Sequence, residues 1–416
     1  MSKCKLPQEL IDIIIDYLPF GYGSCALVCR SWLPAAHRNL FHRVVLPPPN
    51  DFYYSRPDDV PYSKRLDQVL LKSPHISEYI RELEVYDSRD DNWIGTDPTL
   101  PRLLPKLTNL TRIKFRRLHQ RNVPSGLKQS IYSVLELPSL THVELEKATF
   151  ANIDDLKDLL SHAKYSTNLS LNDVSVLSDE PLTHVGEDKG PAEAEVEEHG
   201  LHSRLQSNLV SLRLSLNHHH SAFLDWLIGP RSPWDVSHMH TLQVLSSYLD
   251  DTDVTNRLLK AIGNSLRHFH LLVPYILSNP SPYRSDTNSN TDFNFESNSG
   301  IKFHYLTDII RTKSRQVTEP LPWLLRFLSN IGKFNQIEEI KLEVEIPDCD
   351  DGPVEWSDWE EVDCLLAGAH FESLRKLNIL LLPRATSTRE WLLDGRRNLV
   401  RNLPLLGARG ILVNVR

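Results

Sequence analysis

Glycine is scarce in this sequence, with 16 among 416 residues, whereas average usage is about 7%. Glycine-rich loops that cradle phosphates are therefore disfavoured, and no G-x-x-x-x-G-K-[ST] loop occurs. The run Gly21-Tyr22-Gly23 lacks both the third glycine and the preceding strand of a dinucleotide-binding loop. No G-x-S-x-G or H-E-x-x-H motif is present either. We therefore predict a non-catalytic protein without a cofactor.

Long apolar runs and an excess of positive charge are missing as well. No uninterrupted apolar stretch of about 18 residues occurs, and Asp12 and Asp16 interrupt the apolar N-terminus, which argues against a signal peptide. Lys and Arg number 46 against 54 Asp and Glu, so the net charge is −8. This balance argues against nucleic-acid binding driven by a basic field of the whole chain. We expect a soluble protein of the cytoplasm or nucleus, with neither a nucleic-acid nor a membrane partner.

Cysteine is sparse, and its pattern does not indicate disulfides. An odd number of scattered cysteines makes no disulfide framework, so a reducing compartment is expected. Cys25 and Cys29 have helical spacing but no second ligand pair nearby. We interpret them as small buried hydrophobes and not as zinc ligands. The five cysteines are Cys4, Cys25, Cys29, Cys349 and Cys364.

Clusters of histidine and aspartate are the remaining groups that resemble metal sites. Three adjacent histidines point in different directions on any regular element, so they cannot easily converge on one ion. The aspartate groups lack the regular alternation and the glycine of an EF-hand. We interpret both as solvated loops and predict no metal site. The residues are His218, His219, His220, His238, His240, Asp250, Asp251, Asp253, Asp348, Asp350 and Asp351.

Residues 6–46 have the pattern of three short helices. Pro7 suits a first helical position, where a missing N–H costs nothing, and Pro19 with the Gly21 run ends that helix. Ser24 is placed to cap a second helix. So small a unit makes too little core to be stable alone, so it is expected to pack on a neighbour or a partner. Its apolar residues are Leu10, Ile11, Ile14 and Leu18, then Leu27 and Val28, then Ala35, Ala36, Leu40 and Phe41 in a third helix beginning near Ser31 and Trp32.

One apolar pattern returns along the rest of the chain: apolar, two residues, apolar, one residue, apolar. The first three instances recur about every 30 positions, near the upper edge of leucine-rich-repeat periods. Strands of this pattern alternate with helical stretches, which is typical of an α/β solenoid. The strands are Ile80/Leu83/Val85, Leu110/Ile113/Phe115, Leu140/Val143/Leu145, Leu209/Leu212/Leu214, Leu266/Phe269/Leu271, Ile337/Ile340/Leu342 and Leu374/Leu377/Ile379, with weaker instances at Leu169/Leu171 and Leu242/Leu245. The helical stretches are residues 66–71, 127–137, 153–160, 254–262, 321–331 and 362–369.

The predicted fold is therefore α/β: a small N-terminal helical module (1–46), a proline-rich linker (47–62) and an irregular leucine-rich-repeat-like solenoid (63–416). A doubly wound α/β domain is the alternative, because its strands also read as short apolar runs. Two polar segments, near 178–200 and 278–300, are expected to be mobile inserts between repeats.

The N-terminal segment carries a family resemblance. Leu6-Pro7, Glu9-Leu10, Ile14 and Leu18 are followed by Leu27-Val28-Cys29-Arg30-Ser31-Trp32 and by Arg38, Leu40 and Phe41. Together they resemble the F-box motif, and the run LVCRSWLPAAHRNLF is especially similar to F-box proteins of mushroom-forming fungi. The match covers about a tenth of the chain. It departs from the motif at Phe20-Gly21-Tyr22-Gly23, where a longer polar stretch usually opens the second helix. The later repeats resemble those of F-box proteins with divergent leucine-rich repeats.

This resemblance implies a role in protein degradation. An F-box presses its apolar helices onto the C-terminal helices of the Skp-type adaptor, and through it joins the cullin of an SCF-type ubiquitin ligase. The chain would then be the non-catalytic subunit that recognises the substrate, and its repeats would bind an unknown protein client. By positional match, the expected adaptor-binding residues are Leu6, Pro7, Leu10, Ile11, Ile14, Leu18, Leu27, Val28 and Trp32.

Two other hypotheses stay open. The helical module could cap a protein-binding scaffold that recruits no ligase, because solenoids need a capping unit. Burial of the first helix's apolar face against residues after the proline spacer would favour that reading. An enzyme on an α/β fold would need a Ser/His/Asp set that converges in space, and no motif supports it. The client is unassigned, although a basic stretch around Lys114, Arg116, Arg117 and Arg121 could attract an acidic partner.

Overall fold

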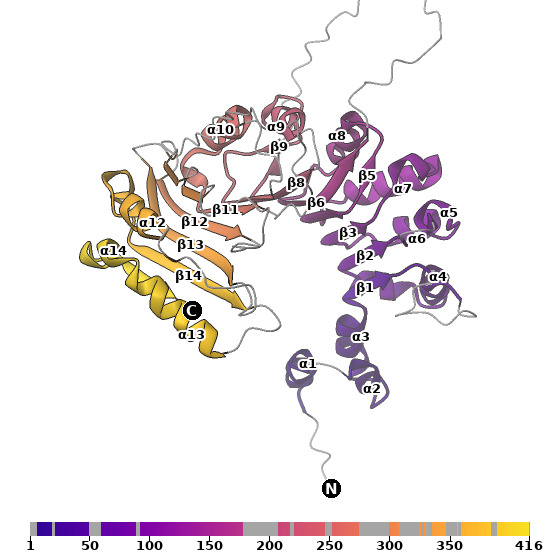
Figure 1. Cartoon of the computed structure of the whole chain (residues 1–416). Coiled ribbons are helices and arrows are strands. Elements are labelled where there is room, and N and C mark those ends of the chain that lie inside the picture. Colours follow the sequence, from indigo (N-terminus) through magenta and orange to yellow (C-terminus); the bar gives the residue numbers. More distant parts are fainter. Residues whose placement is uncertain are drawn as a thin grey trace, which may run out of the picture. The chain divides into compact units, whose positions relative to one another are not determined.

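The computed structural model describes residues 6–18, 21–49, 60–88, 92–177, 207–216, 220–245, 252–273, 299–307, 324–325, 328–329, 331, 335–346, 356, 359–383 and 389–415. The chain forms two compact units, Met1–Ser207 and Asn208–Arg416. Each unit combines a parallel sheet with helices (Figure 1), so the predicted α/β class is confirmed.

The N-terminal unit begins with three short helices, α1 (Gln8–Asp16), α2 (Tyr22–Ala26) and α3 (Leu33–Phe41). Ile11 and Ile15 of α1 pack on Ala35 of α3, and this small cluster is their core. The prediction that Ser24 caps the second helix is wrong. Gly21 precedes that helix instead, with a φ of 92° that favours glycine, so the helix starts early and ends before Leu27.

The first sheet follows the chain order, and all of its strand pairs are parallel. Its first strand, β1, belongs to the segment that we assigned to the N-terminal module, and the buried Pro47 and Pro48 follow it directly. The strands are β1 (Arg43–Leu46), β2 (Glu82–Tyr86), β3 (Arg112–Arg116), β4 (His142–Glu146) and β6 (Asn168–Val176), and the short β5 (Thr149–Phe150) pairs with the end of β6.

The helices of this unit connect successive strands and lie on one face of the sheet (Figure 1). Asn152 caps one of them, because its side-chain oxygen accepts the N–H of Asp155 at 2.8 Å. The helices are α4 (Tyr62–Lys72), α5 (Trp93–Thr96), α6 (Leu100–Leu103), α7 (Ser125–Leu135) and α8 (Ile153–Ser161), with 3₁₀ turns η1 (Pro74–Tyr79), η2 (Leu104–Lys106) and η3 (Gln120–Asn122).

A backbone ladder repeats from strand to strand. Thr111 donates its N–H to Arg81, Thr141 to Thr111 and Thr167 to Thr141, over separations of 30, 30 and 26 residues. The apolar positions are aligned by the same register, so Leu83, Ile113, Val143 and Leu169 form one buried row that faces the helices. The predicted strand pattern is therefore confirmed in these repeats.

The second unit repeats this arrangement. Its sheet is parallel in the order β8-β10-β11-β12-β13-β14-β15, and helices α9, α10, α12, α13 and α14 cover one face (Figure 1). The strands are β8 (Ser211–Leu216), β10 (Thr241–Leu245), β11 (His268–Val273), β12 (Ser299–Thr307), β13 (Gln336–Ile346), β14 (Lys376–Pro383) and β15 (Leu412–Val415), while β7 (Ser207–Asn208) and β9 (Trp234–Asp235) pair separately. The helices are α9 (His220–Ile228), α10 (Thr252–Ile262), α12 (Trp359–Leu366), α13 (Arg389–Arg401) and α14 (Pro404–Ala408), with 3₁₀ turns η4 (Gly263–Ser265) and η7 (Ala369–Phe371).

Several predictions concern residues that the structure leaves undescribed. The insert at 178–200 lies outside the described residues, as does the insert at 278–300 except for its last two residues, which open β12. Most of the helix predicted at 321–331 lies outside them as well. Among the described residues, the sequence pattern missed strands β1, β12 and β15, the two-residue strands β5, β7 and β9, and helices α5, α6, α9, α13 and α14.

A buried carboxylate fixes the last helix of the chain. Asp363 of α12 accepts the N–H of Leu405 at 2.7 Å and that of Leu406 at 2.9 Å, across more than 40 residues of sequence. These N–H groups belong to the first turn of α14, whose own N-cap residue, Leu403, offers no side-chain acceptor. Asp363 therefore caps α14 from another helix.

We expect Asp363→Ala to lower the free energy of unfolding by about 2 kcal/mol, because two N–H groups of α14 lose their acceptor. Urea denaturation measures this change. Asp394→Ala is the matched control, since Asp394 forms only an exposed i,i+3 pair with Arg397, and it should change stability by no more than about 0.5 kcal/mol. Equal effects of the two substitutions would contradict the capping role.

Candidate functional site

Helix α1 is apolar on two adjacent faces. Ile11 and Ile15 form the inward face, which packs on α3. The neighbouring face carries Leu10, Ile13 and Ile14, all exposed, and Tyr17 just beyond the helix is 85% exposed. A surface helix of a self-sufficient domain normally has one apolar stripe and a polar opposite face. The second stripe of α1 thus has no intramolecular cover among the described residues.

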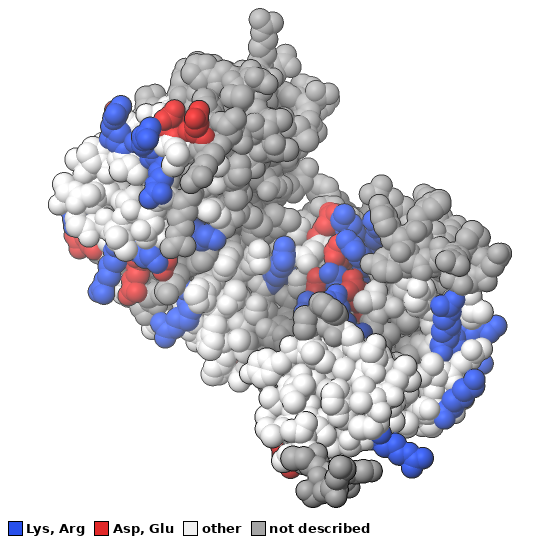
Figure 2. Space-filling model, turned by 90° about the horizontal axis from the view of Figure 1, so that it is seen from below, with Lys and Arg blue, Asp and Glu red and all other residues white. Residues whose placement is uncertain are grey.

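The exposed apolar residues continue beyond α1. Leu27 and Val28 follow α2 and are 88% and 59% exposed. The Gln8 side-chain amide donates to the Ser31 carbonyl at 2.8 Å, so the first turn of α1 lies beside the segment that follows α2. In Figure 2, seen from the side on which α1 and α2 lie in Figure 1, the surface nearest the viewer is mostly uncharged. We call Leu6, Leu10, Ile13, Ile14, Tyr17, Leu27 and Val28 the apolar surface.

The structure divides the nine predicted adaptor-binding residues into two groups. Ile11 is buried, while Leu18 and Trp32 are half-buried, and Trp32 packs against the core of the module. Ile11 and Trp32 therefore help to hold the helices together. Ile13 and Tyr17 are exposed as well but were not among the nine, although the run Ile13-Ile14-Ile15 already indicates a helix that is apolar on more than one face. The exposed group is Leu6, Pro7, Leu10, Ile14, Leu27 and Val28.

Polar contacts hold α1 against α3. Arg38 donates to both carboxylate oxygens of Asp16, at 3.0 and 3.1 Å, and Asn39 donates to the same group at 2.6 Å. The hydrogen bond from Asn39, followed by that from Arg38, holds the pKa of Asp16 below its usual value despite slight burial. This clamp orients α1 with its second apolar stripe outward.

Helix α3 connects the module to the first sheet. Its His37 stacks on His75 of η1, with ring centroids 6.2 Å apart, and lies edge-on to Tyr79 and to Phe41. The chain then continues directly into β1, which pairs with β2. The module is therefore attached to the sheet through α3, while α1 and α2 present the apolar surface.

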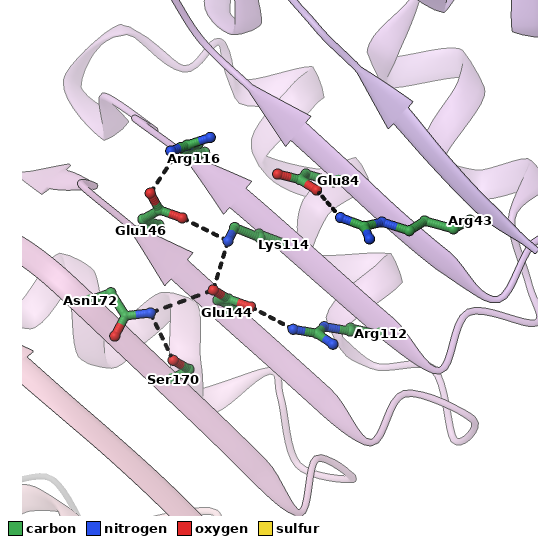
Figure 3. A network of polar contacts seen from close by, with 9 residues as sticks. All are labelled: Arg43, Glu84, Arg112, Lys114, Arg116, Glu144, Glu146, Ser170 and Asn172. Atoms are coloured by element: carbon green, nitrogen blue, oxygen red, sulfur yellow. Dashed lines mark hydrogen bonds and ion pairs between the residues drawn. The ribbon is translucent and has the colours of Figure 1, made fainter. Parts of the chain in front are cut away.

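A second candidate site lies on the face of the first sheet that the helices leave open. Alternate residues of its strands form a polar network, drawn in Figure 3. In register across the sheet, Glu84 pairs with Lys114, Lys114 with Glu144, and Glu144 with Ser170. Acidic strands β2 and β4 thus flank the basic strand β3. We call Arg43, Glu84, Arg112, Lys114, Arg116, Glu144, Glu146, Ser170 and Asn172 the strand-face network.

Lys114 is the centre of this network. Its Nζ lies 2.8 Å from Glu144 Oε1 and 2.6 Å from Glu146 Oε2, so one ammonium bridges two carboxylates. Arg112 Nη2 reaches the other oxygen of Glu144 at 2.9 Å, and Arg116 Nε reaches Glu146 Oε1 at 2.8 Å. The Asn172 amide donates to Ser170 at 3.1 Å and to Glu144 at 3.4 Å. A similar contact recurs in the second unit, where Lys376 and Asn378 both donate to Glu339.

Burial and ion pairing shift the pKa values of the network's charged groups in opposite directions. Burial alone would raise the pKa of Glu144, but hydrogen bonds from Lys114 and Arg112 outweigh it, so the pKa is lowered. The same balance, with Lys114 as donor, lowers the pKa of Glu146. Burial would lower the pKa of Lys114, yet its two carboxylate partners raise it. All three groups are therefore charged at neutral pH, and the network is a set of formal ion pairs.

We also searched the described part of the chain for metal ligands, paired cysteines and membrane-spanning helices. No group of three or more His, Cys, Asp or Glu there could hold a metal ion. Of the residues named above, that part leaves out His218, His219, Asp250, Asp251, Asp348, Cys349, Asp350 and Asp351. Of the cysteine pair predicted to be buried, Cys25 is buried and Cys29 is exposed. No helix within the described ranges is both long and apolar enough to cross a bilayer. The two surfaces therefore carry the functional argument.

Substituting the central lysine tests the network. We expect Lys114→Met to lower the free energy of unfolding by about 2 kcal/mol, because it leaves two largely buried carboxylates without their shared partner. Lys157→Met is the matched control: Lys157 is similarly buried, but its partner Asp154 is 71% exposed, so about 0.5 kcal/mol is expected. Chemical denaturation at neutral pH measures both, and equal losses would contradict this account.

The lowered pKa values of Glu144 and Glu146 set a direction for acid unfolding. Carboxylates with a lowered folded-state pKa stabilise the protein above their unfolded pKa, about 4.3, and that contribution disappears as the pH falls through the folded pKa. We therefore expect Glu144→Gln/Glu146→Gln to flatten the loss of stability between about pH 5 and pH 3. Denaturation curves at a series of pH values measure this slope. An unchanged slope would show that the network contributes nothing to acid unfolding.

Comparison with known proteins adds no relative: no protein-family model matches this chain, and no curated protein matches it significantly.

Proposed function

We propose that this protein is a non-catalytic substrate receptor of an SCF-type, cullin–RING ubiquitin ligase. Helices α1 to α3 act as an F-box that docks on the Skp-type adaptor, and the repeats bind a protein client. The observation that carries the proposal is the apolar surface on α1 and after α2. It lies on the segment that resembles the F-box motif, and it has no cover among the described residues.

The physical support for docking is that the module exposes more large apolar side chains than it buries. Its core consists of Ile11, Ile15 and Ala35 with Tyr22 and Trp32 against them. Seven large apolar side chains remain on the apolar surface outside that core. Exposed patches of this kind mark interaction sites, and a standard protein interface buries roughly 1,600 Å² around a few anchor residues. An adaptor that covers this surface would complete the core that the module lacks.

The repeats support the second half of the proposal. Parallel strands follow one another in chain order, with repeats of 26 to 30 residues and helices on one face. This is the arrangement expected of a leucine-rich-repeat-like solenoid. A solenoid leaves its strand face open over many repeats, which suits the recognition of an extended or bulky client. Catalysis would lie with other subunits, and this chain would supply proximity.

The rival reading, a capped scaffold without a ligase, predicts that the apolar face of α1 is covered by residues after the proline spacer. The exposure of Leu10, Ile13 and Ile14 favours docking of a separate partner instead.

Adaptor binding provides the decisive test. We expect Leu10→Asp/Leu27→Asp to weaken binding of a purified Skp-type adaptor by about 100-fold or more, because two exposed anchors become charged. Both side chains are exposed in the isolated chain, so the fold should persist, as circular dichroism can verify. Calorimetry or a pull-down measures the affinity.

The matched control is Leu71→Asp/Leu177→Asp, which changes two exposed leucines of the same unit outside the apolar surface. It should bind the adaptor as the unmodified chain does. If the unmodified chain failed to bind any Skp-type adaptor, the ligase assignment would be wrong and the scaffold reading would stand.

A further inference from the structure

The strand-face network contains four cationic and three anionic side chains, so its net charge is +1, and the two signs lie at different depths. The side chains of Arg43, Arg112 and Arg116 are 39% to 62% exposed, whereas those of their partners Glu84, Glu144 and Glu146 are only 12% to 17% exposed. The carboxylates therefore lie beneath, close to the sheet, and the guanidinium groups lie above them. A molecule that approaches this face meets the positive ends of the pairs first.

Each of these guanidinium groups also has N–H donors that do not contact its paired carboxylate. Among the described residues, each of the three contacts its carboxylate through one nitrogen: Nη2 of Arg43 with Glu84, Nη2 of Arg112 with Glu144, and Nε of Arg116 with Glu146. A guanidinium has five N–H donors in a fixed fork. Hydrogen bonds to buried carboxylates orient Arg43 and Arg112, whereas Arg116 is held near Glu146 by an ion pair without hydrogen-bond geometry. Holding the side chain in advance reduces the entropy lost when a ligand binds.

We infer that the open face of β1 to β3 binds an anionic segment of the client, a run of carboxylate or phosphate groups held by Arg43, Arg112 and Arg116. The segment is identified as the client's only if the proposed function holds, but the binding chemistry is a property of the network. Arginine forks recognise carboxylates and phosphates in this way, often through two parallel hydrogen bonds. A cationic segment is disfavoured, because the acidic groups are largely buried and already paired.

The spacing of the arginines suits an extended peptide. Arg43 and Arg112 both align with Glu82, on opposite sides of β2. Strand separation therefore places their backbones about 10 Å apart, and Arg116 lies about 13 Å further along β3 than Arg112. An extended chain advances about 3.3 Å per residue, so a segment of about six residues can reach all three.

Direct binding tests the inference on the full-length protein. A fluorescent peptide of about six glutamates and a matched peptide containing phosphoserines are the probes, with a glutamine peptide as the neutral reference. We expect at least one anionic probe to bind, the neutral one not to bind, and the affinity to fall as salt is raised. The stronger of the two anionic probes then identifies the source of the charge. No binding by either would overturn the inference.

Charge-removing variants locate the site. Arg43→Gln/Arg112→Gln/Arg116→Gln should weaken binding of the anionic probe by about 100-fold, or roughly fivefold for each arginine. Because this variant removes three positive charges, Arg112→Gln/Glu144→Gln provides a second variant that leaves the net charge of the network unchanged, and it should weaken binding by about fivefold. Arg397→Gln, on α13 of the other unit, is the control and should leave binding unchanged. Unaltered affinity in folded arginine variants would overturn the assignment.

Adaptor binding by the same proteins separates the two proposals. The arginine variants should bind the Skp-type adaptor normally, and the Leu10→Asp/Leu27→Asp protein should bind the anionic probe normally. Peptide binding without adaptor binding would preserve the anion site and remove the ligase role, whereas the converse would remove the anion site alone.

Discussion

The fold depends on the register between successive parallel strands. In the first unit, Thr111, Thr141 and Thr167 each bond to the residue one repeat earlier, and this ladder aligns everything that follows along each strand. Because side chains alternate between faces, a slip of one residue would move a whole apolar row into solvent. The buried row through Leu83, Ile113, Val143 and Leu169 therefore selects the register, and the backbone ladder maintains it.

The same register creates the strand-face network. Once the apolar rows face the helices, the residues between them must lie on the open face, where neighbouring strands bring their side chains about 5 Å apart. Like charges at that spacing would repel, but acidic β2 and β4 flank basic β3, so each lysine or arginine meets a carboxylate. One constraint, burial of the apolar row, thus decides both what holds the sheet together and which charged groups a partner encounters.

The sequence predicts the parts of this structure that repeat and fails where the repeat is interrupted. Leu110, Ile113 and Phe115 have the same spacing as Leu140, Val143 and Leu145, so the strands could be placed in advance. The start of α2 could not, because it depends on a left-handed Gly21 and not on apolar spacing. Strand β1 was assigned to the helical module because three prolines follow it. The network was missed for a different reason: Lys114 and Glu144 become neighbours only when strands 30 residues apart are set side by side, and each strand alone merely shows charges at exposed positions.

Helix α1 buries some of its apolar residues and exposes others because the core of the module is small. Three short helices enclose little volume, and their core consists of Ile11, Ile15 and Ala35 with Tyr22 and Trp32 packed against them. Further apolar residues on α1 can then only face outward, and they persist in solution because α3 and the Arg38–Asp16 contact hold the helix from the other side. Sequence periodicity could not separate Leu10 from Ile11, since both fit one broad apolar stripe. The distinction needs the crossing of α1 over α3, which buries one residue and leaves its neighbour exposed. The apolar surface is exposed because the core has no room for it, and its burial by a partner is the step that would join the fold of the module to the proposed function.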